Sequence, residues 1–283
     1  MKRARRRVAA ALGLTCPLLS LVALWCVLVV PDQLVVTTAT LELPRWPQEL
    51  DGLRVVAISD IHAGAPHVDV AKLRNVVALA NAQQPDLVVL LGDYVIQDVV
   101  GGRFIPPETT AAELGLLRGR MGVYAVLGNH DNWLDGPRVA RAFRGAGVPV
   151  LDDEVLQLRS AGREFWLVGI PDSWTTTPDV PKLLRRVSAG GTVLAMTHNP
   201  DVFADLPAGI DLLLAGHTHG GQVTLPLLGA PIVPSRYGQR YATGHVVEDG
   251  RHLFVTPGVG TSIVPVRFRV PPEISLLILR SGR

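Results

Sequence analysis

The sequence predicts a layered α/β domain, in which two facing sheets carry helices on their outer sides, preceded by one N-terminal transmembrane helix. Three observations favour this fold class. Residues 8–30 are uncharged and almost wholly apolar. Short apolar runs of strand length then recur along the chain, separated by stretches with apolar residues at helical spacing. Polar clusters follow these runs directly, which is typical of parallel strands that deliver side chains to one sheet edge.

The apolar run at residues 8–30 is long enough to cross a bilayer, because 23 helical residues span roughly 35 Å. Basic residues crowd the first seven positions and none follows the run directly. We therefore expect residues 1–7 in the cytoplasm and residues 31–283 outside it. A cleaved signal peptide is the main alternative, although residues 38–40 are a poor cleavage site. A twin-arginine export signal matches weakly. The length of the run favours an uncleaved signal anchor in the cell membrane.

The net charge of +2 comes from the basic tail, because acidic residues outnumber basic residues in the rest of the chain. We therefore expect no nucleic-acid binding. Both cysteines, Cys16 and Cys26, lie in the apolar run. The body of the protein consequently has no thiol for a disulfide or for a thiolate metal site.

Residues 31–52 are expected to be a linker, since Pro44 and Pro47 oppose a helix. Residues 53–283 then form a single domain without an internal repeat. Its first part predicts alternating strands and helices, the first helix being capped by Asp69. In order, these are strand 53–59, helix 69–84, strand 87–91, helix 107–119 and strand 123–127.

The second part of the domain is predicted to be richer in strands. A helix over residues 135–147 comes first, and a short helix over residues 181–188 follows two strands. Glycine turns separate several of the alternating segments, which is typical of antiparallel pairs. The predicted strands are 155–159, 164–170, 192–196, 211–215, 243–248, 252–256 and 273–279.

Eight polar residues stand at the ends of the predicted strands, and five of them are histidines. Ligand sites of open α/β sheets lie at the carboxyl ends of strands, so we expect these side chains to meet. Two of the histidines are two residues apart and leave an extended chain on the same side. The eight candidates are Asp60, His62, Asp93, Asn129, His130, His198, His217 and His219.

A set of carboxylate, imidazole and amide ligands without cysteine is typical of a site that binds Mn, Fe, Zn, Ni or Co. The ligands are too many for one ion and about enough for two. Two-metal sites hold their ions roughly 3.5–4 Å apart and act on the attacking and leaving oxygens of a phosphoryl displacement. The sequence therefore predicts two divalent metal ions of unassigned identity.

Five blocks of this sequence resemble the calcineurin-like metallophosphoesterase superfamily in type, order and spacing. They are Asp60-x-His62, Gly92-Asp93, Gly128-Asn129-His130-Asp131, His198 and Gly216-His217-x-His219. The resemblance covers about residues 53–222 and implies an αββα metallophosphoesterase sandwich. The sequence Gly-His-Thr-His-Gly-Gly-Gln at 216–222 further resembles a membrane-associated bacterial branch. That branch includes phosphodiesterases and enzymes similar to lipid A precursor pyrophosphatases.

The resemblance also implies a role for each residue. Asp60, His62 and His219 bind one metal, while Asn129, His198 and His217 bind the other, and Asp93 bridges the two. His130 binds no metal but faces the phosphate, as the catalytic residue that stabilises developing charge or protonates the leaving oxygen. Metal-activated hydroxide attacks phosphorus.

Several neighbouring residues receive less specific predictions. Asp131 either orients His130 or caps the segment that follows. Gln222 is expected to orient a histidine ring, and the glycines of 216–221 to give phosphate close access. Asp98 and Asp172 are expected in exposed turns. The remaining histidines, expected on loop or strand surfaces, are His67, His245 and His252.

The resemblance leaves the substrate open. Protein phosphatases of the superfamily resemble Gly-Asp-x-Val-Asp-Arg-Gly where this chain has Gly-Asp-Tyr-Val-Ile-Gln-Asp, which opposes protein dephosphorylation. A membrane anchor favours a phosphodiester or pyrophosphate in a lipid or an envelope polymer. The apolar loops 225–234 and 258–268, with Arg236, Arg240 and Arg267, either form a lipid-facing rim or fold into the core. The alternatives are a phosphomonoesterase or nucleotide phosphatase of the same fold and a non-catalytic metal-binding membrane scaffold.

Overall fold

The computed structural model describes residues 19–97 and 99–282. Two sheets pack face to face, as predicted. The first has the strand order β1-β11-β2-β3-β4, and the second has the order β5-β6-β7-β8-β10-β9. The first sheet comprises β1 (Val35–Leu43), β2 (Leu53–Ile58), β3 (Leu87–Leu90), β4 (Val123–Ala125) and β11 (Glu273–Ser281). The second comprises β5 (Glu154–Ser160), β6 (Arg163–Gly169), β7 (Val193–Met196), β8 (Leu212–Ala215), β9 (Gly244–Glu248) and β10 (Arg251–Val255).

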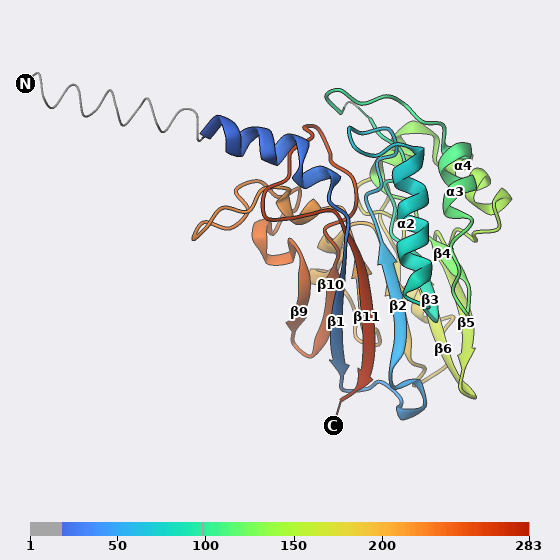
Figure 1. Ribbon diagram of the computed structural model, residues 1–283. Helices are drawn as coiled ribbons and strands as arrows, with labels where there is room; N and C mark the ends of the chain where they lie inside the picture. Colours follow the sequence, from blue (N-terminus) through green and yellow to red (C-terminus); the bar gives the residue numbers. More distant parts are fainter. Residues whose placement is uncertain (1–18, 98, 283) are drawn as a thin grey trace, which may run out of the picture.

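Alternating side chains along the strands build separate layers of the core. Val55 and Ala57 of β2 face the second sheet and join a buried cluster with residues of β6, β7 and β8. Val56 and Ile58 face the other way and pack with the helices. Those helices are α2 (Val70–Ala82), α3 (Pro107–Leu114) and α4 (Asn129–Gly145), and Figure 1 displays them on the outer face of the first sheet.

A third buried cluster covers the outer face of the second sheet. It joins strand residues such as Val193 and Leu213 to Leu183 of α5 (Val180–Leu184) and to Phe203 of the 3₁₀ helix η3 (Pro200–Asp205). The remaining 3₁₀ helices are η1 (Val30–Asp32), η2 (Gln48–Leu50), η4 (His219–Gly221) and η5 (Gly238–Tyr241). The central strands of both sheets, such as β3, β7 and β8, are therefore buried on their two sides, which explains their continuous apolar runs in the sequence.

The segment expected to be a linker, residues 31–52, contains strand β1. This strand pairs in parallel with β11 over nine residues, from Val35 with Glu273 to Leu43 with Ser281. Leu41 and Leu43 are buried between the sheets. The linker prediction was wrong here because the two prolines, Pro44 and Pro47, come after the strand and do not interrupt its hydrogen bonds.

Most ends of the helices and strands lie within a few residues of their predicted positions, but the start of α4 does not. This helix begins at Asn129, directly after the strand end, instead of at residue 135. Asp135 has non-helical backbone angles inside it, and Pro137 follows. The sequence prediction therefore found only the second of two helical pieces that meet at a kink, since proline favours a helix start.

Residues 19–28, part of the predicted transmembrane segment, are helical. Residues 1–18, with the basic tail and the first part of that segment, lie outside the described residues. Within residues 19–97 and 99–282, no helix is both long enough and apolar enough to span a membrane.

Candidate metal centre

All eight predicted site residues meet at the edge where the parallel strands end. Asp60 and His62 follow β2, Asp93 follows β3, and Asn129 and His130 begin α4 after β4. His198 follows β7, and the pair at 217 and 219 follows β8. His130 is partly exposed, while the other seven side chains are buried. The ends of neighbouring strands therefore bring the whole constellation together.

Asp60, His62 and His219 form one cluster of potential metal ligands. The Nε2 atoms of the two histidines are 3.2 Å apart. Asp60 Oδ1 lies 3.3 Å from His219 Nε2 and 4.0 Å from His62 Nε2. Among the described residues, Asp60 Oδ1 has no hydrogen-bond donor although it is buried. These three side chains are able to hold one cation at their common centre.

His198 is the centre of a second cluster. Its Nε2 atom lies 3.2 Å from Asp93 Oδ2, 3.1 Å from Asn129 Oδ1 and 3.1 Å from His217 Nδ1. Asp93, His198 and His217 also have ligand atoms within 4.8 Å of one another. Four residues from four different strand ends are thus able to hold a second cation.

Asp93 lies between the two clusters. Its Oδ2 atom is 3.2 Å from His198 Nε2, 3.6 Å from His62 Nε2 and 4.0 Å from His130 Nε2. Its Oδ1 atom accepts the backbone N–H of His130 at 2.9 Å. Burial opposes the charge on Asp93, but His198 and then His62 hold the pKa of this carboxyl below its ordinary value. The carboxylate is therefore charged and touches both groups of ligands.

Backbone carbonyls set the tautomers of two histidines. His62 Nδ1 faces the Val95 carbonyl at 3.2 Å, and His198 Nδ1 faces the Leu91 carbonyl at 2.7 Å. A carbonyl only accepts hydrogen bonds, so each Nδ1 carries a proton and each Nε2 is the nitrogen directed at the centre. His198 Nε2 faces two acceptors, the oxygens of Asp93 and Asn129, so it either carries a second proton or shares a cation with them.

Acceptors that face acceptors need a cation between them, so the residues present fit a divalent metal. Burial lowers the pKa of His62 to about 3 and that of His217 to about 3, which keeps both rings neutral and able to coordinate. Burial also opposes a charge on His198, yet the neighbouring Asp93 carboxylate raises its pKa to about 10. The centre therefore attracts positive charge, as a proton or as a metal.

Backbone strain is concentrated at the same residues. The φ angles of Asp60, His62, Asp93, His217 and His219 are 51°, 45°, 57°, 69° and 51°. Left-handed backbone costs of order 1–3 kcal/mol for residues other than glycine, and it persists where the surrounding structure enforces it. Such clustering at strand ends is typical of functional sites.

Two glycines allow the strand ends to approach one another. A Cβ atom on Gly128 would lie 2.2 Å from Asp93 Oδ1, and one on Gly216 would lie 1.9 Å from Ser59 Oγ. In the 216–221 loop, a Cβ atom on Gly221 would meet Ala230 at 2.5 Å. The glycines of this loop therefore permit close packing against the protein, and close access of phosphate to them stays a prediction.

Asp131 caps α4 and holds the loop after β3. It accepts backbone N–H groups from Gly128, Asp93 and Tyr94 at 2.9, 2.8 and 2.9 Å. Burial, and next the neighbouring Asp93 carboxylate, raise the pKa of Asp131 to about 7. Of the two roles left open by the sequence, the structure supports capping, and the cap also fixes the backbone that carries Asp93.

Gln222 and Asp172 do not lie as expected. Gln222 joins two loops, since its Oε1 accepts from Ser262 N at 2.7 Å and its Nε2 donates to the Val264 carbonyl at 3.3 Å. It does not orient a histidine ring through either bond. Asp172 is fully buried instead of exposed, because its Oδ2 organises a turn through the backbone N–H groups of Trp174 and Thr175. Asp98 lies outside the described residues.

The three remaining histidines have structural partners. His67 Nε2 is 2.9 Å from the Val27 carbonyl. His245 and His252 stack across β9 and β10, with 3.0 Å between ring nitrogens. His252 is buried, so its predicted surface position was wrong. Its strand is paired on both sides, which the local sequence alone did not reveal.

Two tryptophans beside the centre were missed by the sequence reasoning. Trp174 meets His217 edge-on at 4.3 Å between ring centroids, and Trp133 lies 5.1 Å from His130. The two indoles are 6.1 Å apart, and both remain about half exposed. Trp133 follows His130 by three residues on α4, a spacing that favours contact. For Trp174, the sequence contains no comparable signal.

The two apolar loops differ in part from the rim that the sequence suggested. Leu227, Leu228 and Ile263 are largely exposed. Arg267 is fully buried and donates to backbone carbonyls, and Arg240 pairs with Glu248 at 2.6 Å. The Arg267 guanidinium is therefore held by protein carbonyls, while the charge of the half-exposed Arg240 is offset by Glu248.

Comparisons with known proteins agree with the site. Residues 53–221 match the model of a family described as calcineurin-like phosphoesterase. The chain is 29% identical to the uncharacterized metallophosphoesterase YkuE of Bacillus subtilis (strain 168), over 89% of this chain and 87% of the relative. It is 32% identical to phosphodiesterase YaeI of Escherichia coli (strain K12), covering 80% and 82%. Identity is 30% to a transmembrane protein with metallophosphoesterase domain of Danio rerio, covering 85% and 56%.

Proposed function

The chain belongs to the calcineurin-like phosphoesterase family and is a metal-dependent phosphoesterase, and from this we propose that it hydrolyses phosphodiester or pyrophosphate bonds with two divalent ions. The observation that carries the proposal is the pair of ligand clusters with Asp93 between them. A carboxylate in this position offsets the repulsion between two dications, while the Asn129 amide adds an oxygen without adding charge.

The proposed ligands divide between the clusters in the way the resemblance implies. One ion is held by Asp60, His62 and His219, the other by Asn129, His198 and His217, and both by Asp93. When bound, two such ions lower the pKa of water and offset the charge that develops on phosphorus oxygens. The Leu91 and Val95 carbonyls keep the Nε2 lone pairs of His198 and His62 directed inward.

His130 is proposed as the catalytic residue that faces the phosphate. Its ring is the one partly exposed imidazole of the eight candidate residues, and its Nε2 lies 4.0 Å from Asp93 Oδ2. The bond from its backbone N–H to Asp93 Oδ1 ties its position to the metal ligands. From there its ring is able to donate a hydrogen bond to a phosphate oxygen or a proton to the leaving oxygen.

The test of this function is the ratio of diester to monoester hydrolysis. With Mn²⁺ present, we expect the full chain to cleave bis-p-nitrophenyl phosphate with a kcat/KM about tenfold or more above that for p-nitrophenyl phosphate. The reason is that the half-exposed indoles of Trp133 and Trp174 offer contact surface for a second ester group. A reversed ratio would favour the phosphomonoesterase or nucleotide phosphatase alternative. Bound metal without turnover of either ester would favour the non-catalytic scaffold.

We also propose that the domain works at a membrane, with residues 1–7 as a cytoplasmic tail and residues 8–30 as an uncleaved signal anchor. The helical residues 19–28 expose Leu19, Leu24 and Leu28. The end of this helix is bonded to the loop beside the site, where Arg267 N–H donates to the Cys26 carbonyl at 3.0 Å. Phe268 N–H next along that loop donates to the Gln222 carbonyl. Backbone hydrogen bonds thus link the end of the helix to the loop 258–268 and that loop to Gln222, which precedes the exposed leucines of 225–234 in the chain. This arrangement favours a lipid or envelope substrate.

Replacing Leu227 and Leu228 with serine tests the membrane-facing loop. These side chains are 106% and 70% exposed, so we expect unchanged unfolding but a several-fold lower rate on a diester presented in vesicles. The rate on soluble bis-p-nitrophenyl phosphate should stay within about twofold. A matched control is Val247→Ser, which removes an exposed apolar side chain on β9. Equal rates for both variants on vesicles would contradict the proposal.

A further inference from the structure

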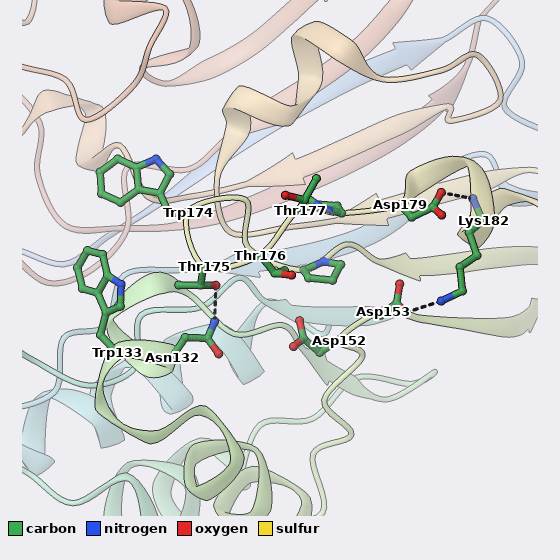
Figure 2. Close-up of a pocket in the computed structure, with 12 residues that line it drawn as sticks. Asn132, Trp133, Asp152, Asp153, Trp174, Thr175, Thr176, Thr177, Asp179 and Lys182 are labelled. Atoms are coloured by element: carbon green, nitrogen blue, oxygen red, sulfur yellow. Dashed lines mark hydrogen bonds and ion pairs between the residues drawn. The ribbon is translucent and has the colours of Figure 1, made fainter.

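A cavity of about 790 Å³ opens beside the metal centre, and the predicted ligands contribute nothing to its lining. Figure 2 looks into it, with the two indoles at one end and Lys182 at the other. The walls come from the start of α4, from residues 152–153 and from the loop 171–179. A bond from Asn132 Nδ2 to Thr175 Oγ1, 3.1 Å long, joins the first and third of these walls.

The two tryptophans connect this cavity to the metal centre. Both line it, and each also contacts a site histidine, Trp174 with His217 and Trp133 with His130. A phosphoester held at the centre would therefore extend one of its ester groups across the indoles. Since the indoles are half exposed, their faces are accessible to that group.

The charged residues that line the cavity carry a net negative charge, because the ion pair of Lys182 with Asp153 leaves Asp152 and Asp179 uncompensated. Lys182 Nζ lies 3.3 Å from Asp153 Oδ2, and Asp179 accepts the Lys182 backbone N–H at 2.9 Å. The Asp152 carboxylate is not matched by a cation in the lining. Its Oδ1 atom is buried and has no hydrogen-bond partner among the described residues.

A second buried oxygen lies behind this wall. Asp172 Oδ1 likewise has no hydrogen-bond partner within residues 19–97 and 99–282, and its side chain is fully buried next to the lining residue Pro171. Burial, and then the charge of Asp172, raise the pKa of Asp152 to about 6. A cation bound in the cavity would offset the repulsion between the Asp152 and Asp172 carboxylates and so stabilise their charged forms.

We propose that this cavity binds an ammonium group on the alcohol arm of the substrate, with the two indoles and the Asp152 carboxylate as its recognition elements. The inference rests on the proposed diesterase function and names a substrate class for it, amino-alcohol phosphodiesters. Indole faces attract cations, most of all quaternary ammonium groups, and the carboxylate adds a direct charge interaction. An anionic arm, such as a second phosphate, would be repelled by the same carboxylates.

The test compares two substrates that differ in one charge. p-Nitrophenyl phosphorylcholine carries the ammonium, and p-nitrophenyl 3,3-dimethylbutyl phosphate replaces its nitrogen by carbon. For the full chain with Mn²⁺, we expect the choline ester to have a kcat/KM about tenfold higher. Asp152→Asn should reduce this ratio toward one. Asp249→Asn, which neutralises a side chain 92% exposed on the turn after β9, should leave the ratio unchanged.

The possible results distinguish a failure of the ammonium site from a failure of the proposed diesterase function. If the full chain hydrolyses both esters with equal efficiency, the ammonium site is contradicted while the diesterase remains. If it hydrolyses no diester, the function itself fails. Wild-type protein alone decides between these results, so a folding defect in Asp152→Asn does not block the test. A ratio that Asp152→Asn leaves at its wild-type value would also overturn the assignment.

The source of the ammonium arm is distinguished by two further substrates. Hydrolysis of glycerophosphocholine indicates a soluble diester, and hydrolysis of phosphatidylcholine in vesicles indicates a lipid. Phosphorus NMR follows both reactions. Together with the higher rate on the choline ester, cleavage of either substrate supports the proposal and identifies the source, while equal rates on the two nitrophenyl esters contradict it.

Discussion

Replacement of Asp93 by asparagine should lower kcat/KM for bis-p-nitrophenyl phosphate by about 10³-fold or more. Asp93 Oδ2 lies within 3.2–4.0 Å of His198, His62 and His130, so one carboxylate serves both ligand clusters. An amide of the same shape retains an acceptor for the His130 N–H but loses the negative charge. Two dications held close together then repel each other without compensation.

The metal content is the second measurement for this variant. We expect about two ions per chain in the wild-type protein and one or none in Asp93→Asn, by elemental analysis after dialysis. The fold should persist, because asparagine keeps the size of the side chain. Asp249→Asn serves as the matched control and should retain metal and activity. An Asp93→Asn protein with two ions and near wild-type turnover would refute the bridging role.

Arg267→Met should lower the free energy of unfolding by about 3–5 kcal/mol. The Arg267 side chain is fully buried and makes five hydrogen bonds to the carbonyls of Pro257, Gly258, Gly260 and Val270. Methionine has a similar length but no donor, so the carbonyls of Pro257, Gly260 and Val270 lose the guanidinium, while that of Gly258 keeps only the Glu273 N–H. Burial lowers the pKa of Arg267 only to about 10, and it therefore stays charged at neutral pH.

The loop that Arg267 holds also reaches the metal centre. A Cβ atom on Gly258 would lie 2.5 Å from Asp60 Cβ, so this backbone packs directly on a proposed ligand. Weaker metal binding should accompany the lost stability. Urea unfolding of the full chain in detergent measures the change, with Arg236→Met as the control on an exposed arginine, expected within about 0.5 kcal/mol. Equal midpoints for the two variants would show that the buried bonds contribute nothing.

The sequence predicted which polar side chains meet at one edge of the sheets, because each follows an apolar run. Parallel strands buried on both faces have continuous apolar sequences, and their ends meet at one edge. His198 and His217 are 19 residues apart, yet their ring nitrogens are 3.1 Å apart for this reason. The two-sheet sandwich is confirmed in the same way. The assignment of each residue to a metal remains a prediction.

Errors arose where the environment of a residue depends on distant segments. β1 was taken for a linker because each of its residues pairs with a residue of β11 that lies 238 positions later (273 − 35), from Val35 with Glu273 to Leu43 with Ser281. Asp172 and His252 were placed on the surface because polar side chains are usually exposed. In both cases, hydrogen bonds or paired strands compensate the burial, and these partners are invisible in the local sequence.

The sequence by itself determined the family, the eight candidate side chains that meet and the alternation of strands and helices, since periodicity and motif spacing are local properties. Only the tertiary structure decided which apolar loop residues remain exposed, that Arg267 is buried, and that Trp133 and Trp174 stand together beside His130 and His217. The physical reason is that burial and charge pairing depend on segments brought together from opposite ends of the chain. The cavity proposed for the ammonium group exists only through that assembly.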